Sequence, residues 1–398
     1  MPIFRVTADS RQQLESRLYD TIKALDLNTI PDSQFDPAAY RFSVYYQDII
    51  DLKAQLSQAT LSTTTYSQPW CLLFTGQGAQ YPEMGYKLRQ SFPVVQQSLH
   101  RMETLFSAVG ADITPFFSES FSDAIHQTQN TQLCMVALEL ALADFWHDVG
   151  LPVGCAIGHS IGELAACIHA GYYSRSEGAH LVFERARRMQ QVDSSGSMLA
   201  VRADKNTLAS IISRFNSHGD IVEYAGFNSP VQTILSGSES AITNIKNHLA
   251  ESAIKSVELQ VSHAFHSRFM DPMLADFTTA IAHLSANKPC YRVYSNLSGD
   301  LIDAKTLTAN YWSQQLRSPV DFIGCVDSAW RDGYRCFLEV GPTPVLHGLI
   351  GKIFPDKNAV VSLSSMHKRH DAVTSLLTTA CRIDSNVVGL QLASYCAF

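Results

Sequence analysis

A serine between two glycines is the residue of this sequence best placed to do chemistry. It lies in the segment Gly158-His159-Ser160-Ile161-Gly162, between a short apolar stretch, residues 153–157, and a helical stretch, residues 161–170. A serine on a tight strand-to-helix turn has a strained backbone, and glycines are needed there because a β-carbon would collide with the neighbouring chain. The pattern therefore predicts that Ser160 is a nucleophile.

Such a serine needs a base, because its hydroxyl is a poor nucleophile until the proton is removed. Two histidines three residues apart, His263 and His266, follow a predicted strand. A polar turn at the edge of a sheet has the same appearance, and the spacing does not choose between the two histidines. A catalytic base is therefore predicted at one of these two positions.

An arginine follows in the next helical stretch, residues 177–190. Arg185 could hold a carboxylate through two parallel hydrogen bonds, which the planar guanidinium permits and a lysine does not. Arg187 and Arg188 lie close by, so the pattern alone equally fits a solvated arginine on a basic helix face. Both interpretations stay open at this point.

The elements that position these residues predict an α/β fold. Short continuous apolar stretches, typical of buried parallel strands, alternate with stretches of helical periodicity. The strands are expected at residues 70–75, 153–157 and 336–340, and the helices at 131–149, 161–170, 177–190 and 345–353. We expect an α/β-hydrolase-like core with a mostly parallel sheet.

The order of predicted strands and helices changes between residues 197 and 261. Strands are expected at residues 198–201, 221–227, 232–236 and 254–261, and helices at 207–215 and 240–250. The order β-α-β-β-α-β is that of the split βαβ unit. It predicts a ferredoxin-like subdomain inserted into the core.

The remaining segments flank this core, which we assign to residues 66–196 and 262–355. Residues 1–65 are predicted to form a small α/β domain, with helices at 11–25 and 49–58 and a strand at 40–46. The Thr-rich segment 62–67 is predicted to be a linker. Residues 356–398 are expected to form a C-terminal tail with one helical stretch, residues 371–381.

The composition excludes several classes of function. The 398 residues carry 30 Lys and Arg against 37 Asp and Glu, a formal net charge of −7, without the basic run that tracks a nucleic-acid backbone. No apolar stretch reaches the ~18 residues of a membrane span, and residues 1–20 lack the apolar block of a signal peptide. The nine cysteines and fourteen histidines show no metal-ligand spacing. We expect a soluble cytoplasmic protein without metal, nucleic acid or membrane.

Six motifs occur in order along the chain: Gly76-Gln77-Gly78-Ala79-Gln80, Gly158-His159-Ser160-Ile161-Gly162-Glu163, Arg185 with its neighbours, Asn228-Ser229-Pro230, His263-Ala264-Phe265-His266-Ser267 and Glu339-Val340-Gly341-Pro342. Together they resemble the motifs of malonyl-CoA:acyl carrier protein transacylases, and most closely those of the acyltransferase domains of polyketide synthases. The resemblance covers roughly residues 70–355, and residues 1–65 resemble the linker that joins ketosynthase to acyltransferase in those synthases.

The resemblance assigns roles to particular residues. It implies a catalytic dyad of Ser160 and His266, with the histidine held by carbonyl groups and not by a carboxylate. It implies an oxyanion hole formed by the backbone N–H groups of Gln77 and Ile161. It makes Arg185 the partner of the free malonyl carboxylate. The remaining substrate-binding residues that it implies are Gln132, Asn228, His159, Phe265 and His263.

The implied reaction moves a malonyl group from malonyl-CoA, through an ester on Ser160, to the phosphopantetheine thiol of an acyl carrier protein in polyketide or fatty acid biosynthesis. The His-Ala-Phe-His motif and Ile161 resemble the malonyl type and not the methylmalonyl type. No bound cofactor is implied. The partners expected are an acyl carrier protein and ketosynthase modules, and the chain is expected to act in trans.

Three alternatives stay beside this interpretation. One is a transferase for a substituted or carrier-bound malonyl donor. Another is a serine thioesterase or esterase, whose acid would be Asp193, Asp204 or Asp220. The third is a non-catalytic docking module within a synthase.

Overall fold

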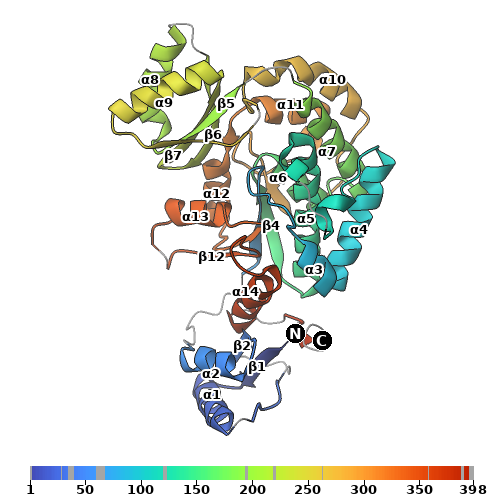
Figure 1. Ribbon diagram of the computed structural model, residues 1–398, viewed down its shortest axis with the longest axis vertical. Coiled ribbons are helices and arrows are strands. Elements are labelled where there is room, and N and C mark those ends of the chain that lie inside the picture. Colours follow the sequence, from blue (N-terminus) through green and yellow to red (C-terminus); the bar gives the residue numbers. More distant parts are fainter. Residues whose placement is uncertain are drawn as a thin grey trace.

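The computed structural model describes residues 2–27, 29–34, 40–59, 68–119, 123–192, 196–217, 221–261, 263–356, 358–386 and 390–393. These residues form three sheets along one long axis (Figure 1). A two-stranded sheet lies at one end, a five-stranded parallel sheet in the middle, and a second five-stranded sheet at the other end. The predicted α/β fold with a parallel sheet is confirmed.

The central sheet is wholly parallel, in the order β12-β11-β3-β4-β9. Its strands are β3 (Trp70–Phe74), β4 (Val153–Gly158), β9 (Arg292–Tyr294), β11 (Cys336–Val340) and β12 (Val361–Ser364). β3 and β11 are buried along their whole length, as expected of continuous apolar strands covered on both faces. Because the strands are parallel, the loops after β3, β4, β9 and β11 leave the same edge of the sheet.

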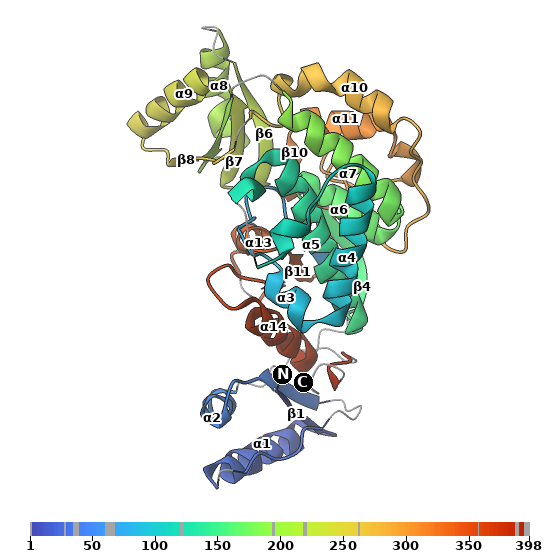
Figure 2. The same ribbon diagram turned by 45° about the vertical axis from the view of Figure 1, so that its right-hand side comes forward.

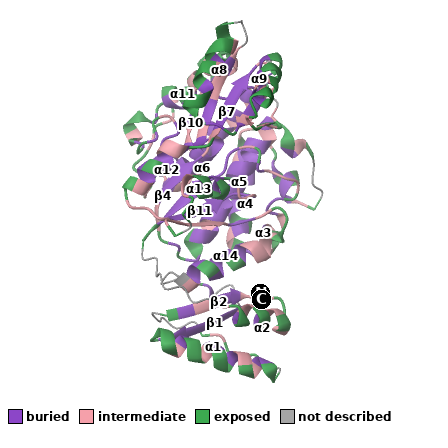
Figure 3. Ribbon diagram, turned by 90° about the vertical axis from the view of Figure 1, so that its left-hand side faces the viewer, coloured by how far each residue is buried: buried purple, intermediate pink, exposed green. Residues whose placement is uncertain are grey.

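Helices cover both faces of this sheet (Figures 1 and 3). Leu72 and Phe74 pack into one layer, whereas Cys71 and Leu73 pack into the other. The first layer is built mainly from α3 (Tyr86–Ser91), α4 (Pro93–Ala108), α5 (Thr128–Asp148), α6 (Ile161–Ala170) and α7 (Arg175–Gln190), and the second from α12 (Phe322–Arg331) and α13 (Leu346–Ile353). α10 (Asp271–Ile281) packs beside α7, and α11 (Ala309–Arg317) packs against α10 (Figure 2).

The small sheet has the strand order β10-β6-β7-β5-β8. The element order is β5 (Ser197–Val201), α8 (Lys205–Ser217), β6 (Val222–Ser229), β7 (Gln232–Gly237), α9 (Glu239–Glu251) and β8 (Ser256–Glu258), and β10 (Val320–Asp321) pairs in parallel with β6. The strand predicted at 254–261 is shorter than expected, because the chain leaves the sheet after Glu258 and lines a cavity with Leu259 and Val261. Apolar side chains of α8 and α9 close this unit's own core.

The N-terminal sheet pairs β1 (Ile3–Ala8) with β2 (Tyr40–Tyr45), and α1 (Arg11–Asp26) and α2 (Ile49–Ser57) pack on one side. The two helices begin where Ser10 and Asp48 cap them. β1 was not among the expected elements. The linker predicted at 62–67 lies outside the described residues.

The prediction of a tail from residue 356 onward is wrong. β12 pairs with β11 and forms an edge of the central sheet. α14 (Ala372–Asn386), which contains the predicted helix, then packs against β2 (Figure 1). The signal of β12 is weak because the strand is four residues long and only half-buried. The C-terminal segment therefore belongs to the core and joins it to the N-terminal sheet.

Candidate active site

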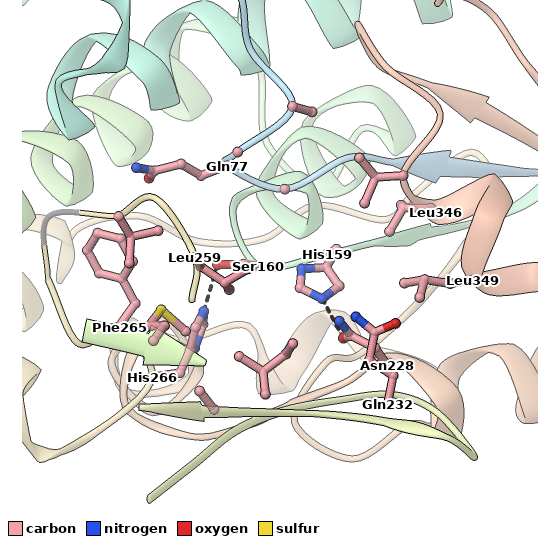
Figure 4. A pocket seen from close by; sticks show the side chains of 18 of the residues that line it. Gln77, His159, Ser160, Asn228, Gln232, Leu259, Phe265, His266, Leu346 and Leu349 are labelled. Atoms are coloured by element: carbon pink, nitrogen blue, oxygen red, sulfur yellow. Dashed lines mark hydrogen bonds between the residues drawn. The ribbon is translucent and has the colours of Figure 1, made fainter. Parts of the chain in front are cut away.

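A cavity of about 250 Å³ is lined by both the central and the small sheet (Figure 4). The loop after β3, the turn after β4 and α13 contribute from the core, and β5, β6 and β7 contribute from the small sheet. The polar side chains lining it are those of Gln77, His159, Ser160, Arg185, Asn228, Gln232 and His266. Most of the remaining wall is apolar, including Met198, Ile234, Leu259, Phe265, Val345 and Leu349.

Ser160 lies on a strained turn between β4 and α6. Its backbone has φ 55° and ψ −111°, a conformation that residues with a side chain rarely adopt. A β-carbon on Gly158 would lie 2.0 Å from the Glu163 nitrogen, and one on Gly162 would lie 2.2 Å from the Phe74 carbonyl oxygen. The two glycines of the motif are therefore required by the close approach of strand and helix.

Ser160 and His266 are hydrogen-bonded, with 2.7 Å between Oγ and Nε2 (Figure 4). The other ring nitrogen of His266, Nδ1, lies 3.1 Å from the Gln315 carbonyl oxygen and 3.0 Å from that of Ser318. Since carbonyl groups only accept, Nδ1 carries the proton and Nε2 is left to accept the serine proton. His263 instead donates through Nε2 to the Val192 carbonyl oxygen at 3.0 Å. Of the two histidines, His266 is therefore the one hydrogen-bonded to the Ser160 hydroxyl.

The surroundings keep His266 neutral. Burial, and next the positive charge of Arg185, lower the pKa of His266 to about 3. A neutral imidazole beside a serine hydroxyl can act as a general base over the whole physiological pH range.

Arg185 is buried and reaches the reacting serine. Its Nη2 donates to Ser160 Oγ at 3.1 Å, and its Nη1 donates to Gln132 Oε1 at 2.5 Å. Its Nε has no hydrogen-bond partner among the described residues. Burial lowers the pKa of Arg185 to about 9, and the carboxyl of Glu163 opposes this shift. The buried guanidinium therefore keeps an unused donor beside the cavity.

The other arginines of α7 differ from Arg185. Arg187 and Arg188 both pair with Glu184 on the same helix. Arg185 is only 2% exposed, which excludes the interpretation of a solvated arginine on a basic face. Its neighbour Gln132, on α5, is buried and lies outside the lining of the cavity.

The expected oxyanion donors belong to the loop after β3 and to the first turn of α6. Gln77 lines the cavity in the loop after β3. Ile161 is the first residue of α6, so its backbone N–H has no acceptor within the helix. A helix N-terminus favours developing negative charge in front of it.

The remaining expected residues lie further along the cavity. His159 Nε2 donates to Asn228 Oδ1 at 2.9 Å, which joins the core to β6 (Figure 4). Burial lowers the pKa of His159. Phe265 lines the cavity next to His266, whereas His263 is not part of the lining.

Sequence reasoning missed three residues that hold the dyad. Gln315 and Ser318 supply the carbonyl groups that bind His266. Asn296 accepts the Ser160 N–H at 2.8 Å. No local pattern marks these residues, because they approach Ser160 only in the folded chain.

The geometry does not support a Ser-His-acid triad among the described residues. His266 Nδ1 is held by carbonyl groups, and the carboxylate of Asp204 caps Thr207 at the start of α8. Asp193 and Asp220 lie outside the described residues. In the described part of the chain, no three His, Cys, Asp or Glu side chains are grouped to hold a metal ion, and no helix is long and apolar enough to cross a membrane.

Sequence relatives are known for most of the chain. A non-reducing polyketide synthase, nscA, of Arthroderma gypseum is 33% identical over 314 residues, which is 77% of this chain and 17% of the relative. The atrochrysone carboxylic acid synthase of Passalora fulva is 30% identical over 414 residues, 95% of this chain and 23% of the relative. The chain thus spans about a fifth of the length of these relatives.

Solved structures share the fold. The acyltransferase domain from the second module of the salinomycin polyketide synthase is 26% identical, with a TM-score of 0.79 over 99% of this chain and 85% of that one. The malonyl CoA-acyl carrier protein transacylase of Clostridium perfringens is 26% identical, with a TM-score of 0.72 over 80% of this chain and 98% of that one. The family model for the acyl transferase domain matches residues 71–387, so the chain belongs to the acyltransferase family of polyketide synthase domains and malonyl-CoA:acyl carrier protein transacylases.

Proposed function

We propose that this chain transfers a malonyl group from CoA, through an ester on Ser160, to the phosphopantetheine thiol of an acyl carrier protein. The observation that carries the proposal is the buried guanidinium of Arg185, 3.1 Å from Ser160 Oγ and with its Nε unpaired among the described residues. A buried cation beside a nucleophile is suited to an acyl group that carries a negative charge of its own.

The first step forms the acyl-enzyme. Ser160 Oγ attacks the thioester carbonyl carbon while its proton passes to His266 Nε2. The N–H groups of Gln77 and Ile161 bind the oxygen that becomes negative. The C–S bond then breaks, His266 gives its proton to the CoA sulfur, and free CoA leaves.

The second step reverses the first with a different thiol. The phosphopantetheine sulfur gives its proton to His266 and attacks the ester carbonyl, the C–Oγ bond breaks, and His266 returns the proton to Ser160. Arg185 fixes the malonyl carboxylate during both steps. A fixed acyl group favours the positioned thiol over random attack by water.

The wall beside the dyad supports a small acyl group. Phe265 lines the cavity next to His266, and we expect its ring to restrict the space at the α-carbon of a bound acyl group. One methyl group changes such discrimination by only ~1–3 kcal/mol, so a preference for malonyl over methylmalonyl is expected to be moderate.

Intact-mass measurement after mixing with malonyl-, methylmalonyl- or acetyl-CoA tests the proposal. We expect a malonyl adduct on the natural chain and on Ser240→Ala, whose exposed serine lies on α9, and none on Ser160→Ala. A phosphopantetheinylated carrier protein should then remove the adduct. No adduct from any CoA ester would contradict the proposal and favour a carrier-bound donor or a docking role; release of free malonate faster than transfer would favour a thioesterase.

The proposal also covers the domains outside the acyltransferase core. Residues 1–65 are proposed as a ketosynthase-to-acyltransferase type of linker, which implies ketosynthase as a partner. Residues 197–261 are proposed as a ferredoxin-like subdomain, and the order β8-β5-β7-β6 supports this. The relatives give no support to action in trans, because their matching segments belong to much longer chains.

A further inference from the structure

Asn296 lies directly behind the Ser160 turn. It follows β9, which is parallel to β4, so both chains leave the sheet at the same edge. Its side-chain Nδ2 donates to the Gly158 carbonyl oxygen at 2.7 Å, and its Oδ1 accepts the Ser160 N–H at 2.8 Å. Only this orientation of the amide satisfies both partners, because the carbonyl must accept and the N–H must donate.

The two partners are the two ends of the strained part of the turn. Backbone conformations such as that of Ser160 persist only where the surroundings fix them. An amide that spans Gly158 and Ser160 supplies such a constraint. It also occupies the Ser160 N–H, which leaves the N–H of Ile161 as the donor at the helix start.

Asn296 is itself held from two sides. Its backbone N–H donates to Glu163 Oε2 at 2.8 Å, and its carbonyl oxygen accepts the Asp321 N–H at 2.8 Å. On the opposite side of the turn, Gln315 Nε2 donates to the Ser160 carbonyl oxygen at 2.8 Å. Asn296 is 1% exposed and does not line the cavity, so it meets the substrate only through Ser160.

We propose that Asn296 is a positioning residue that holds Ser160 in its reactive conformation by bridging the Gly158 carbonyl and the Ser160 N–H. This inference rests on the proposed use of Ser160 as the nucleophile. Its specific consequence is that the side chain sets the rate of acylation and leaves the binding of the CoA ester unchanged.

The first test compares Asn296→Ala with a matched control. In Asn216→Ala the lost amide also bridges a backbone carbonyl and N–H, those of Val222, but on the small sheet. Single-turnover acylation by malonyl-CoA should slow by about 100-fold at saturation in Asn296→Ala, as expected for a misplaced reacting group. The half-saturating concentration should stay within about threefold, and Asn216→Ala should match the natural chain.

A second variant, Asn296→Asp, distinguishes a loss of Ser160 positioning from a general loss of folding. The carboxyl introduced by Asn296→Asp can accept the Ser160 N–H in either state, but it donates to the Gly158 carbonyl only when protonated. Its acylation rate, divided by that of the natural chain at the same pH, should therefore rise as the pH falls. The natural chain at the same pH is the reference, because the other charged or titratable side chains around this position are present in both proteins: Glu163, His159, His266, Tyr311, Asp321 and Cys325.

A serine-directed fluorophosphonate makes the test independent of the acyl donor. Ser160 Oγ forms a bond to phosphorus, fluoride leaves, and the serine proton passes to His266. If the natural chain is labelled but takes no malonyl group, the proposed function fails while the role of Asn296 is still measured. Equal labelling of Asn296→Ala and Asn216→Ala, or a pH-independent ratio for Asn296→Asp, would overturn the inference.

Discussion

At the scale of single residues, Arg185 and His266 bind the same serine hydroxyl. Arg185 donates to Ser160 Oγ, while Ser160 donates to His266. After burial, the charge of Arg185 is the next largest cause that lowers the pKa of His266. A bound malonyl carboxylate would neutralise that charge, so the substrate itself would make the base stronger.

Replacing Arg185 should slow acylation by a charged acyl group more than acylation by a neutral one. Arg185→Ala should slow acylation by malonyl-CoA about 100-fold or more, since each charge-assisted hydrogen bond contributes about 1.5–3 kcal/mol. Acetyl-CoA, which has no carboxylate, should be affected much less. Arg187→Ala is the control, because Arg187 is paired with Glu184. Equal losses with both CoA esters would contradict a carboxylate-binding role.

The same variant should also change the pH dependence of Ser160. The base is active when neutral, so activity is lost as the pH falls through the pKa of His266, about 3 in the natural chain. Removing the positive charge raises that pKa, although burial still holds it below the ordinary value. Fluorophosphonate labelling over about pH 4–8 should therefore begin to fall at a higher pH in Arg185→Ala than in the natural chain. Superimposable profiles would count against this coupling.

At the scale of elements, the turn between β4 and α6 depends on a close contact with β3. The α6 helix begins so near that strand that Gly162 has no room for a side chain. The strand order places β3 directly beside β4, so the contact is a consequence of the sheet. Glu339 of β11 reinforces this edge, since it accepts from Thr75 Oγ1 and from the Leu346 N–H, both at 3.0 Å.

Gly162→Ala should therefore damage both stability and acylation. Its new β-carbon would lie 2.2 Å from the Phe74 carbonyl oxygen, and overpacking of this kind typically destabilises by ~1–3 kcal/mol. Gly348→Ala on α13 is the control, because no atom lies within 4 Å of its new β-carbon and alanine favours a helix by ~1 kcal/mol. Thermal unfolding and single-turnover acylation would show the difference. An unchanged Gly162→Ala protein would contradict the contact.

At the scale of the whole molecule, a buried ion cluster joins the two ends of the chain. Asp384 on α14 pairs with Arg5 of β1 and Arg41 of β2, and it also accepts from Ser43. Asp384 is fully buried, and the two arginines are nearly so. The polar face of the N-terminal sheet is therefore covered by a helix that arrives from the far end of the sequence.

Asp384→Ala should destabilise the protein by about 3–5 kcal/mol, because it leaves two buried arginines without their carboxylate. Glu15→Ala removes one partner of an exposed pair with Arg11 and should leave the urea midpoint unchanged. Urea unfolding followed by circular dichroism compares the two variants. If both midpoints agree with that of the natural chain, the ion cluster does not hold the ends together.

The sequence by itself determined the local parts of this protein. β3 and β11 are continuous apolar runs, and the glycine-serine-glycine turn lies between a strand and a helix that adjoin it in the chain. These signals are local because they depend on side-chain periodicity and backbone freedom over a few residues. The resemblance of the motifs assigned Arg185 to the substrate carboxylate. The local pattern alone equally fitted a solvated arginine on a basic helix face.

Only the tertiary structure decided the rest. His263 and His266 are three residues apart, and only the fold shows that His266 contacts Ser160. Asn296 and Gln315 lie 136 and 155 residues from Ser160 and carry no pattern of their own. The short strand β12 joins the core through its pairing with β11. These features are contacts between segments far apart in the sequence. They form only on folding, so the pattern of neighbouring residues does not predict them.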